Sequence, residues 1–335
     1  MPDELAHWAA DRAPSLLARA EAEAVAVLRD ALVGAALRQR DRRVTPRETV
    51  PRTEPVSRPK PESGEVLWTY CVLGAGDRVP AGLAGVDGST PVERIASGGL
   101  VALVSRVPLS DFGEEPLRRN LNDLEWLERV ARGHEAVLER TLESATIVPL
   151  RLCTIFEDED GVRRMLDEQR GALTAALELL GGHQEWGVKL LVDRKALEAA
   201  ARARNPEAGA LADELDTRSA GGAYMLRRRL ERQVREAADD LAASVADDVH
   251  ARLQDWARDA VLNPPQNRDL SGHEGEMLLN GAYLVETPKV SRLRELVDEL
   301  HERHRELGVR LELTGPWPPY NFIPRDAATA GAATG

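Results

Sequence analysis

The chain has 335 residues, a formal net charge of −12 and only two cysteines. Its length allows two domains of about 100–200 residues, each with its own core, and its acidic balance argues against duplex nucleic acid as a partner, because neutralising phosphates requires clustered Lys and Arg. Cys71 and Cys153 lie in apolar runs, which favours buried reduced thiols over a disulfide framework and excludes a metal site built from cysteine alone.

The N-terminal region predicts one amphipathic helix within residues 1–41. Apolar residues recur at three- and four-residue spacing between positions 14 and 40 and form a single stripe. This stripe requires a partner, which is either the body of the protein or another chain. Residues 42–64 follow as a Pro-rich linker. The first residues lack the basic and apolar regions of a signal peptide, and the apolar run contains Arg29 and Asp30, so we expect a cytoplasmic protein with no membrane span.

A first domain is predicted at residues 65–193. Its expected elements are a strand at 66–73, a hairpin of 92–96 and 100–104 joined by Gly98-Gly99, a helix at 122–143 with Asn122 as N-cap, a strand at 146–153, a helix at 159–180 and a strand at 185–192. This order resembles the ferredoxin-like α+β plan, in which helices cover one face of an antiparallel sheet.

A second, helix-rich α+β domain is predicted at residues 194–324, followed by a disordered tail at 325–335. The expected helices span 194–204, 206–215, 224–261 and 290–307, and the expected strands span 277–285 and 309–313. Gly308 is placed to end the last helix.

The segment after the last strand carries the main candidate site. Pro316, Pro318 and Pro319 lack amide donors, so the segment cannot be a central strand and is expected to continue as a semi-rigid arm. Large aromatic side chains on a stiff backbone either complete the protein's own core or offer a docking surface that loses little entropy on binding. The candidate partner-binding residues of the arm are Pro316, Trp317, Pro318, Pro319, Tyr320 and Phe322.

Two further residues are candidates for partner contact. Arg151 interrupts an apolar strand and requires a carboxylate or carbonyl partner if it is covered. Trp186 precedes Gly187 at the start of a strand, a pattern typical of close backbone approach or a bulge.

No catalytic, cofactor-binding or metal-binding residue is predicted. Gly74-Ala75-Gly76 lacks the third glycine and the βαβ context of a dinucleotide site. His301 and His304 share a helix without a further ligand motif, and His134 is expected at the polar edge of its helix. No Ser, Cys or Thr lies in a nucleophile elbow.

Four motifs carry a family resemblance: Ile147–Arg151, Glu185–Lys189, Leu279–Val285 and Thr314–Phe322. In this order and spacing they resemble the gas vesicle GvpF/GvpL family, over roughly residues 65–324. The resemblance implies a non-enzymatic accessory or minor structural protein of gas vesicles that contacts the major shell protein and other gas vesicle proteins during assembly, without cofactor, nucleic acid or membrane. Leu152-Cys153 stands where many relatives have Phe-Gly.

The residues alone leave two other interpretations of the function open. A ferredoxin-like sheet also suits a small-molecule-binding regulatory module. Alternatively, the chain is a helical scaffold that self-associates through residues 14–40.

Overall fold

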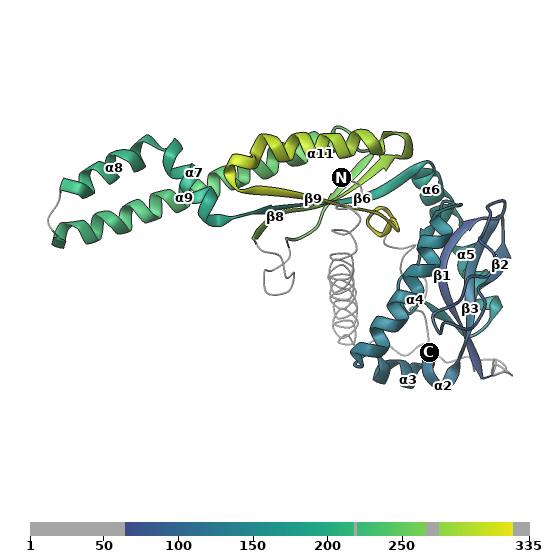
Figure 1. Cartoon of the computed structure of the whole chain (residues 1–335). Helices are drawn as coiled ribbons and strands as arrows, with labels where there is room; N and C mark the ends of the chain where they lie inside the picture. The colour runs from purple at the N-terminus through teal and green to yellow at the C-terminus, as the bar shows by residue number, and fades with distance from the viewer. Residues whose placement is uncertain (1–63, 218–219, 266–274, 324–335) are drawn as a thin grey trace, which may run out of the picture. The chain divides into compact units, whose positions relative to one another are not determined.

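The computed structural model describes residues 64–217, 220–265 and 275–323 (Figure 1). They form two compact units: unit 1 contains the described residues up to Leu179 together with Ile323, and unit 2 runs from Leu180 to Phe322. The predicted N-terminal helix, the linker as far as residue 63 and the tail at 325–335 lie outside the described residues.

Unit 1 contains an antiparallel sheet. Its strands are β1 (Glu65–Gly74), β2 (Glu93–Ser97), β3 (Leu100–Pro108), β4 (Val148–Pro149) and β5 (Ile155–Phe156). The strand order is β2-β3-β1-β4, and β5 also pairs with β1. The predicted hairpin is confirmed: Gly98 and Gly99 join β2 to β3 with φ of 56° and 86°, the left-handed conformation that favours glycine in a two-residue turn.

Helices lie on both faces of this sheet rather than on one. The helices of unit 1 are α2 (Leu109–Phe112), α3 (Glu114–Asn120), α4 (Leu124–Leu142), α5 (Glu159–Glu168) and α6 (Arg170–Leu180). Trp68 of β1 donates to His134 of α4, whereas Arg106 of β3 pairs with Glu159 of α5. Trp68 is opposite Ser105 in the ladder, so Trp68 and Arg106 point to opposite faces. β1 is consequently buried along both faces.

Three boundaries in unit 1 differ from the sequence prediction. The N-cap of α4 is Asp123, not Asn122, because the Asp123 carboxylate accepts hydrogen bonds from the first-turn amides. The strand predicted at 146–153 pairs only at Val148–Pro149, since the chain then turns through Cys153 at φ 65°. The helix predicted at 159–180 is interrupted at Gln169, which leaves helical geometry at φ −103°.

Unit 2 contains the second antiparallel sheet. Its strands are β6 (His183–Val192), β7 (Asp259–Leu262), β8 (Glu276–Glu286) and β9 (Val309–Trp317), in the order β7-β8-β6-β9. β6 was predicted to complete the first domain, but it is a central strand of the second sheet, paired with β8 on one side and β9 on the other. The boundary between the compact units therefore lies near Leu180 instead of after Asp193.

The helices of unit 2 are α7 (Arg194–Arg204), α8 (Pro206–Thr217), α9 (Ala220–Gln254) and α11 (Val290–His304), with short 3₁₀ turns η1 (Thr287–Lys289), η2 (Arg305–Leu307) and η3 (Tyr320–Phe322). The second half of α9, α11 and the sheet share one core. The first half of α9 instead packs on α8, and the two helices form a hairpin extending beyond the sheet (Figure 1). α9 ends seven residues before its predicted end, at Gln254, and β7 occupies Asp259–Leu262. Gly308 adopts the predicted left-handed C-cap, φ 72°.

Candidate partner-binding site

The proline-rich segment predicted as an arm leaves the edge of the second sheet. We call residues 315–322 the C-terminal arm. β9 pairs only with β6, so the expectation that this strand is not central is confirmed. The ladder continues past Pro316 to Trp317, with a register shift between Glu185 and Gly187 of β6. At Gly315, φ is 128° and a Cβ atom would lie 3.0 Å from the Glu185 carbonyl oxygen, so glycine is required for this close approach.

The arm residues divide into an exposed and a buried set. Trp317 is 37% exposed, and Pro316 beside it is also exposed. Pro318, Pro319 and Phe322 are buried, whereas Tyr320 is half-buried. The arm therefore has both roles that its composition allows. Its distal part, residues 318–322, packs against the rest of unit 2, and its proximal part presents the indole of Trp317 at the surface. The partner-contact role of all six residues stays a prediction.

A buried carboxylate fixes the distal arm to β6. Glu185 is 4% exposed, and its Oε1 and Oε2 atoms accept hydrogen bonds from Asn321 Nδ2 and Asn321 N at 2.6 and 3.2 Å. Burial raises the pKa of Glu185 to about 7, while the two hydrogen bonds from Asn321 oppose that shift. We call this contact the Glu185–Asn321 latch. Its partners lie within two of the quoted motifs, but no sequence signal indicated that they meet.

Trp186 supports the arm from within the core. Its side chain is buried, its Nε1 donates to Gln184 Oε1 at 3.2 Å, and the Arg294 guanidinium lies 5.0 Å from its ring centroid, a cation–π contact. The predicted close backbone approach is at the next residue: a Cβ on Gly187 would lie 2.8 Å from Thr314 Oγ1. Thr314 in turn accepts a hydrogen bond from Trp317 Nε1 at 3.1 Å, which orients the exposed indole.

Arg151 belongs to unit 1, whereas the C-terminal arm belongs to unit 2. It is exposed in the turn that follows β4 and forms no side-chain ion pair with another described residue. Its carbonyl oxygen accepts hydrogen bonds from both Thr154 N and Thr154 Oγ1. Because Arg151 is exposed, its guanidinium needs no buried partner, and its partner-contact role stays a prediction.

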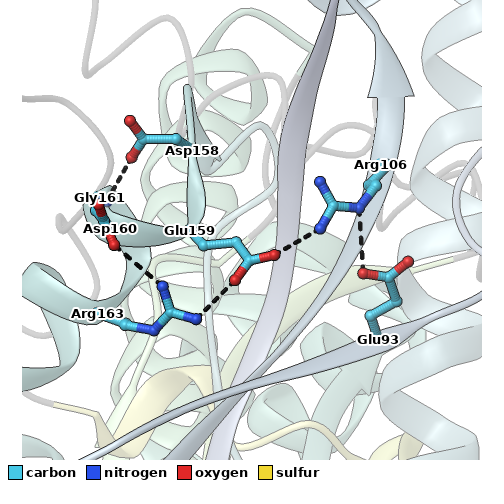
Figure 2. Close-up of polar contacts among 7 residues, drawn as sticks. All are labelled: Glu93, Arg106, Asp158, Glu159, Asp160, Gly161 and Arg163. Atoms are coloured by element: carbon cyan, nitrogen blue, oxygen red, sulfur yellow. Dashed lines mark hydrogen bonds and ion pairs between the residues drawn. The ribbon is translucent and has the colours of Figure 1, made fainter. Parts of the chain in front are cut away.

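Among the described residues of unit 1, Arg106, Glu159 and Arg163 form the centre of a charge network (Figure 2). Arg106 donates to Glu93 at 3.2 Å and to Glu159 at 2.6 Å, and Arg163 donates to Glu159 at 2.6 Å and to Asp160 at 3.0 Å. Hydrogen bonds from the two arginines lower the pKa of Glu159. The network joins β2, β3 and α5, but solvent screens its exposed and half-exposed side chains, so each pair contributes little to stability.

His134 is buried, not at the polar edge of its helix. Its Nδ1 accepts from Trp68 Nε1 at 3.1 Å, so Nε2 carries the proton and donates to the Leu150 carbonyl at 3.2 Å. Burial lowers the pKa of His134 to about 4. Both nitrogens are thus occupied in a neutral ring, which leaves none for a metal or a proton transfer.

The remaining reactive groups are not activated. Burial raises the pKa of Cys71 well above its ordinary value and that of Cys153 to about 12, so both thiols are protonated near neutral pH. The ring of His304 pairs with Asp248 at 3.0 Å. Among the described residues, no group of three or more His, Cys, Asp and Glu side chains is arranged to hold a metal ion. Nor does any described helix combine the length and apolar character needed to cross a membrane.

These features define a two-unit α+β protein with an ordered aromatic arm at a sheet edge. The chain belongs to the family of gas vesicle synthesis proteins GvpL/GvpF, whose model matches residues 66–324. The predicted resemblance is therefore confirmed.

Two curated relatives come from Streptomyces sp. strain CB03234. Gas vesicle protein L is 39% identical over 257 residues, which cover 76% of this chain and 91% of the relative. Gas vesicle protein F is 29% identical over 246 residues, covering 73% and 93%. The crystal structure of GvpF from Anabaena sp. PCC7120 matches with a TM-score of 0.59 at 21% identity, covering 77% of this chain and 98% of that one. This last likeness supports the fold alone.

Proposed function

We propose that this protein is a non-enzymatic assembly factor of gas vesicles that binds shell subunits and other gas vesicle proteins in the cytoplasm. The chain belongs to a family of gas vesicle synthesis proteins, and its sequence similarity to this family extends over residues of both units. The unactivated thiols and the doubly hydrogen-bonded His134 are in keeping with a protein that binds other polypeptides and does not transform a substrate.

The observation that carries the proposal is the exposed, pre-oriented Trp317. Its indole is held by Thr314, its neighbour Pro316 restricts the backbone, and the Glu185–Asn321 latch anchors the segment behind it. A side chain ordered before binding loses little entropy on association, and tryptophans at such positions often contribute about 2 kcal/mol or more to binding.

The proposal predicts that Trp317→Ala weakens binding to the major shell protein. We expect a loss of at least about tenfold in affinity, with the thermal stability of the protein nearly unchanged because the indole is partly exposed. The measurement is co-purification of tagged full-length protein with co-expressed shell protein, followed by titration of the purified pair.

The chain offers a matched control in Trp256. It is also 37% exposed but lies after α9, away from the arm in sequence, where the Arg292 guanidinium is 5.9 Å from its ring. Trp256→Ala should leave binding intact. If both variants lose affinity equally, or if Trp317→Ala binds as tightly as the wild type, the arm is not the binding site. If the wild-type protein does not associate with the shell protein at all, the proposed function itself is wrong.

A further inference from the structure

The hairpin of α8 and α9 carries a second, chemically different surface. α9 has 35 residues and is therefore about 52 Å long. Its second half is buried in the main core of unit 2 from Ala238 onward, whereas its first half packs on α8 through a small separate cluster that includes Ala208, Leu211 and Leu230. Residues on the opposite face of this first half, among them Arg228, Arg232 and Arg235, are consequently exposed.

That open face is basic, although the chain as a whole has a net charge of −12. Arg228, Arg232 and Arg235 are all exposed and recur at four- and three-residue spacing, which places them along one side of the helix. Their side chains are nearly unneutralised by the described residues: the only ion pair formed is Arg232 with Glu236 at 3.9 Å. Glu231 and Glu236 lie at the margins of the stripe.

Two large side chains extend the stripe at its N-terminal end. Tyr224 is 59% exposed and Met225 is 73% exposed, the two highest values among the large hydrophobic side chains of the described residues. Tyr, Met and Arg are the residue types enriched in protein interfaces over other surfaces. An exposed apolar pair continuous with three arginines therefore differs from an ordinary solvated helix face.

We infer that residues Tyr224, Met225, Arg228, Arg232 and Arg235 form a docking stripe for an acidic polypeptide segment, in which carboxylates meet the arginines and an apolar side chain covers Tyr224 and Met225. A second copy of the same stripe is a poor occupant, because antiparallel pairing would oppose arginine to arginine. The overall acidity of the chain disfavours nucleic acid and anionic lipid at a distance, whereas a short peptide contacts only the local basic stripe. This surface is independent of the C-terminal arm and of the proposed function.

The probe is a fluorescent peptide of about 18 residues with four glutamates along one helical face and two leucines at one end of it. Binding to the full-length protein is followed by fluorescence anisotropy. We expect Arg228→Glu/Arg232→Glu/Arg235→Glu to weaken binding at least about tenfold, and binding by the wild type to weaken as salt rises from about 50 to 300 mM. Tyr224→Ala/Met225→Ala should weaken binding about fivefold without altering that salt dependence.

The matched control changes the same charge elsewhere. Arg118→Glu/Arg119→Glu/Arg140→Glu alters three exposed arginines of unit 1 and should retain wild-type binding. The inference is overturned if the two triple variants lose binding equally, if a peptide of scrambled sequence binds as well, or if the wild type does not bind the peptide. It is also overturned if a single-stranded oligonucleotide of about 20 nucleotides or phosphatidylserine vesicles bind the stripe more tightly than the peptide does.

Discussion

At the scale of single residues, Glu185 of unit 2 is a carboxyl group whose buried environment changes its ordinary acid–base chemistry. It is buried, and among the described residues it has no cationic partner and accepts side-chain hydrogen bonds only from the two donors of Asn321. A carboxyl in such a site favours its protonated form, which explains why its pKa rises from 4.5 to about 7. The folded protein therefore binds a proton at Glu185 in a pH range where the unfolded chain has released it.

This shift predicts a specific dependence of stability on pH. The stabilisation linked to the Glu185 proton is fully present below about pH 4.5 and is lost as pH rises through 7, because the folded pKa lies above the unfolded one. A shift of this size corresponds to at most about 3 kcal/mol. Urea unfolding of Glu185→Gln and wild type at several pH values should show that the wild type loses stability relative to the variant between about pH 4.5 and pH 7, the range between the unfolded and the folded pKa.

The comparison with the variant isolates Glu185 from His134, which acts in the opposite direction. His134 is held neutral with a pKa of about 4, so its contribution is present above pH 6.5 and is lost as pH falls through 4. Glu295→Gln removes an exposed carboxylate of α11 and serves as the control, with a pH profile parallel to that of the wild type. Parallel profiles for Glu185→Gln and wild type would contradict a raised pKa at Glu185.

At Cys153 the backbone adopts a left-handed conformation that the residue type does not indicate. Its φ of 65° is in the left-handed region, which costs most residues about 1–2 kcal/mol but costs glycine little. The turn that ends the pairing of β4 is thus formed here without the glycine that would have indicated it in the sequence.

At the scale of secondary-structure elements, the start of α4 tests how a helix boundary is set. Both Asn122 and Asp123 are good N-cap residues, and the sequence prediction selected Asn122. In the structure, Asp123 Oδ1 accepts from Glu125 N at 3.0 Å and from Trp126 N at 3.3 Å. The Asn122 side chain instead donates to the Arg118 carbonyl at the end of α3.

We therefore expect Asp123→Ala to lower the free energy of unfolding by about 1 kcal/mol, because two first-turn amides lose their acceptor. Asn122→Ala is the neighbouring control and should cost less than half as much. Chemical denaturation monitored by circular dichroism distinguishes the two. A larger loss of stability for Asn122→Ala than for Asp123→Ala would show that Asn122, the residue predicted from the sequence, is the N-cap of α4.

At the scale of the whole molecule, the position of β6 decides where the two units divide. The strand is paired on both sides within the second sheet, and Val188, Leu190 and Val192 belong to the core of unit 2. A fragment of residues 194–323 lacks this central strand and separates β8 from β9. We expect it not to unfold cooperatively, whereas a fragment of residues 181–323 should do so.

Both fragments can be compared by thermal unfolding and by the dispersion of their amide proton resonances. The longer fragment differs only by 13 residues at its N-terminus, which makes the shorter one its control. Cooperative unfolding by residues 194–323 alone would show that β6 is dispensable for unit 2 and would support the boundary predicted after Asp193.

The sequence by itself determined the features that depend on neighbours along the chain. Gly98-Gly99 specified the hairpin, Gly308 specified a helix end, Pro316 excluded a central strand, and the four motifs identified the family. Periodicity also gave the type of the longer described helices and strands, since the side chains that face the core recur at a fixed spacing, but it did not indicate the short α2, α3 and β7.

Only the tertiary structure decided the features that join distant segments. The sheet to which β6 belongs, the burial of His134 and the Glu185–Asn321 latch, whose partners are 136 residues apart, have no local signature. A strand's alternation of apolar and polar residues indicates that it is half-buried but does not name the strand beside it, because backbone hydrogen bonds are the same for every sequence. Which aromatic of the arm stays exposed is likewise fixed by how the last turn packs on β6, and this places Trp317 at the surface and Phe322 within the core.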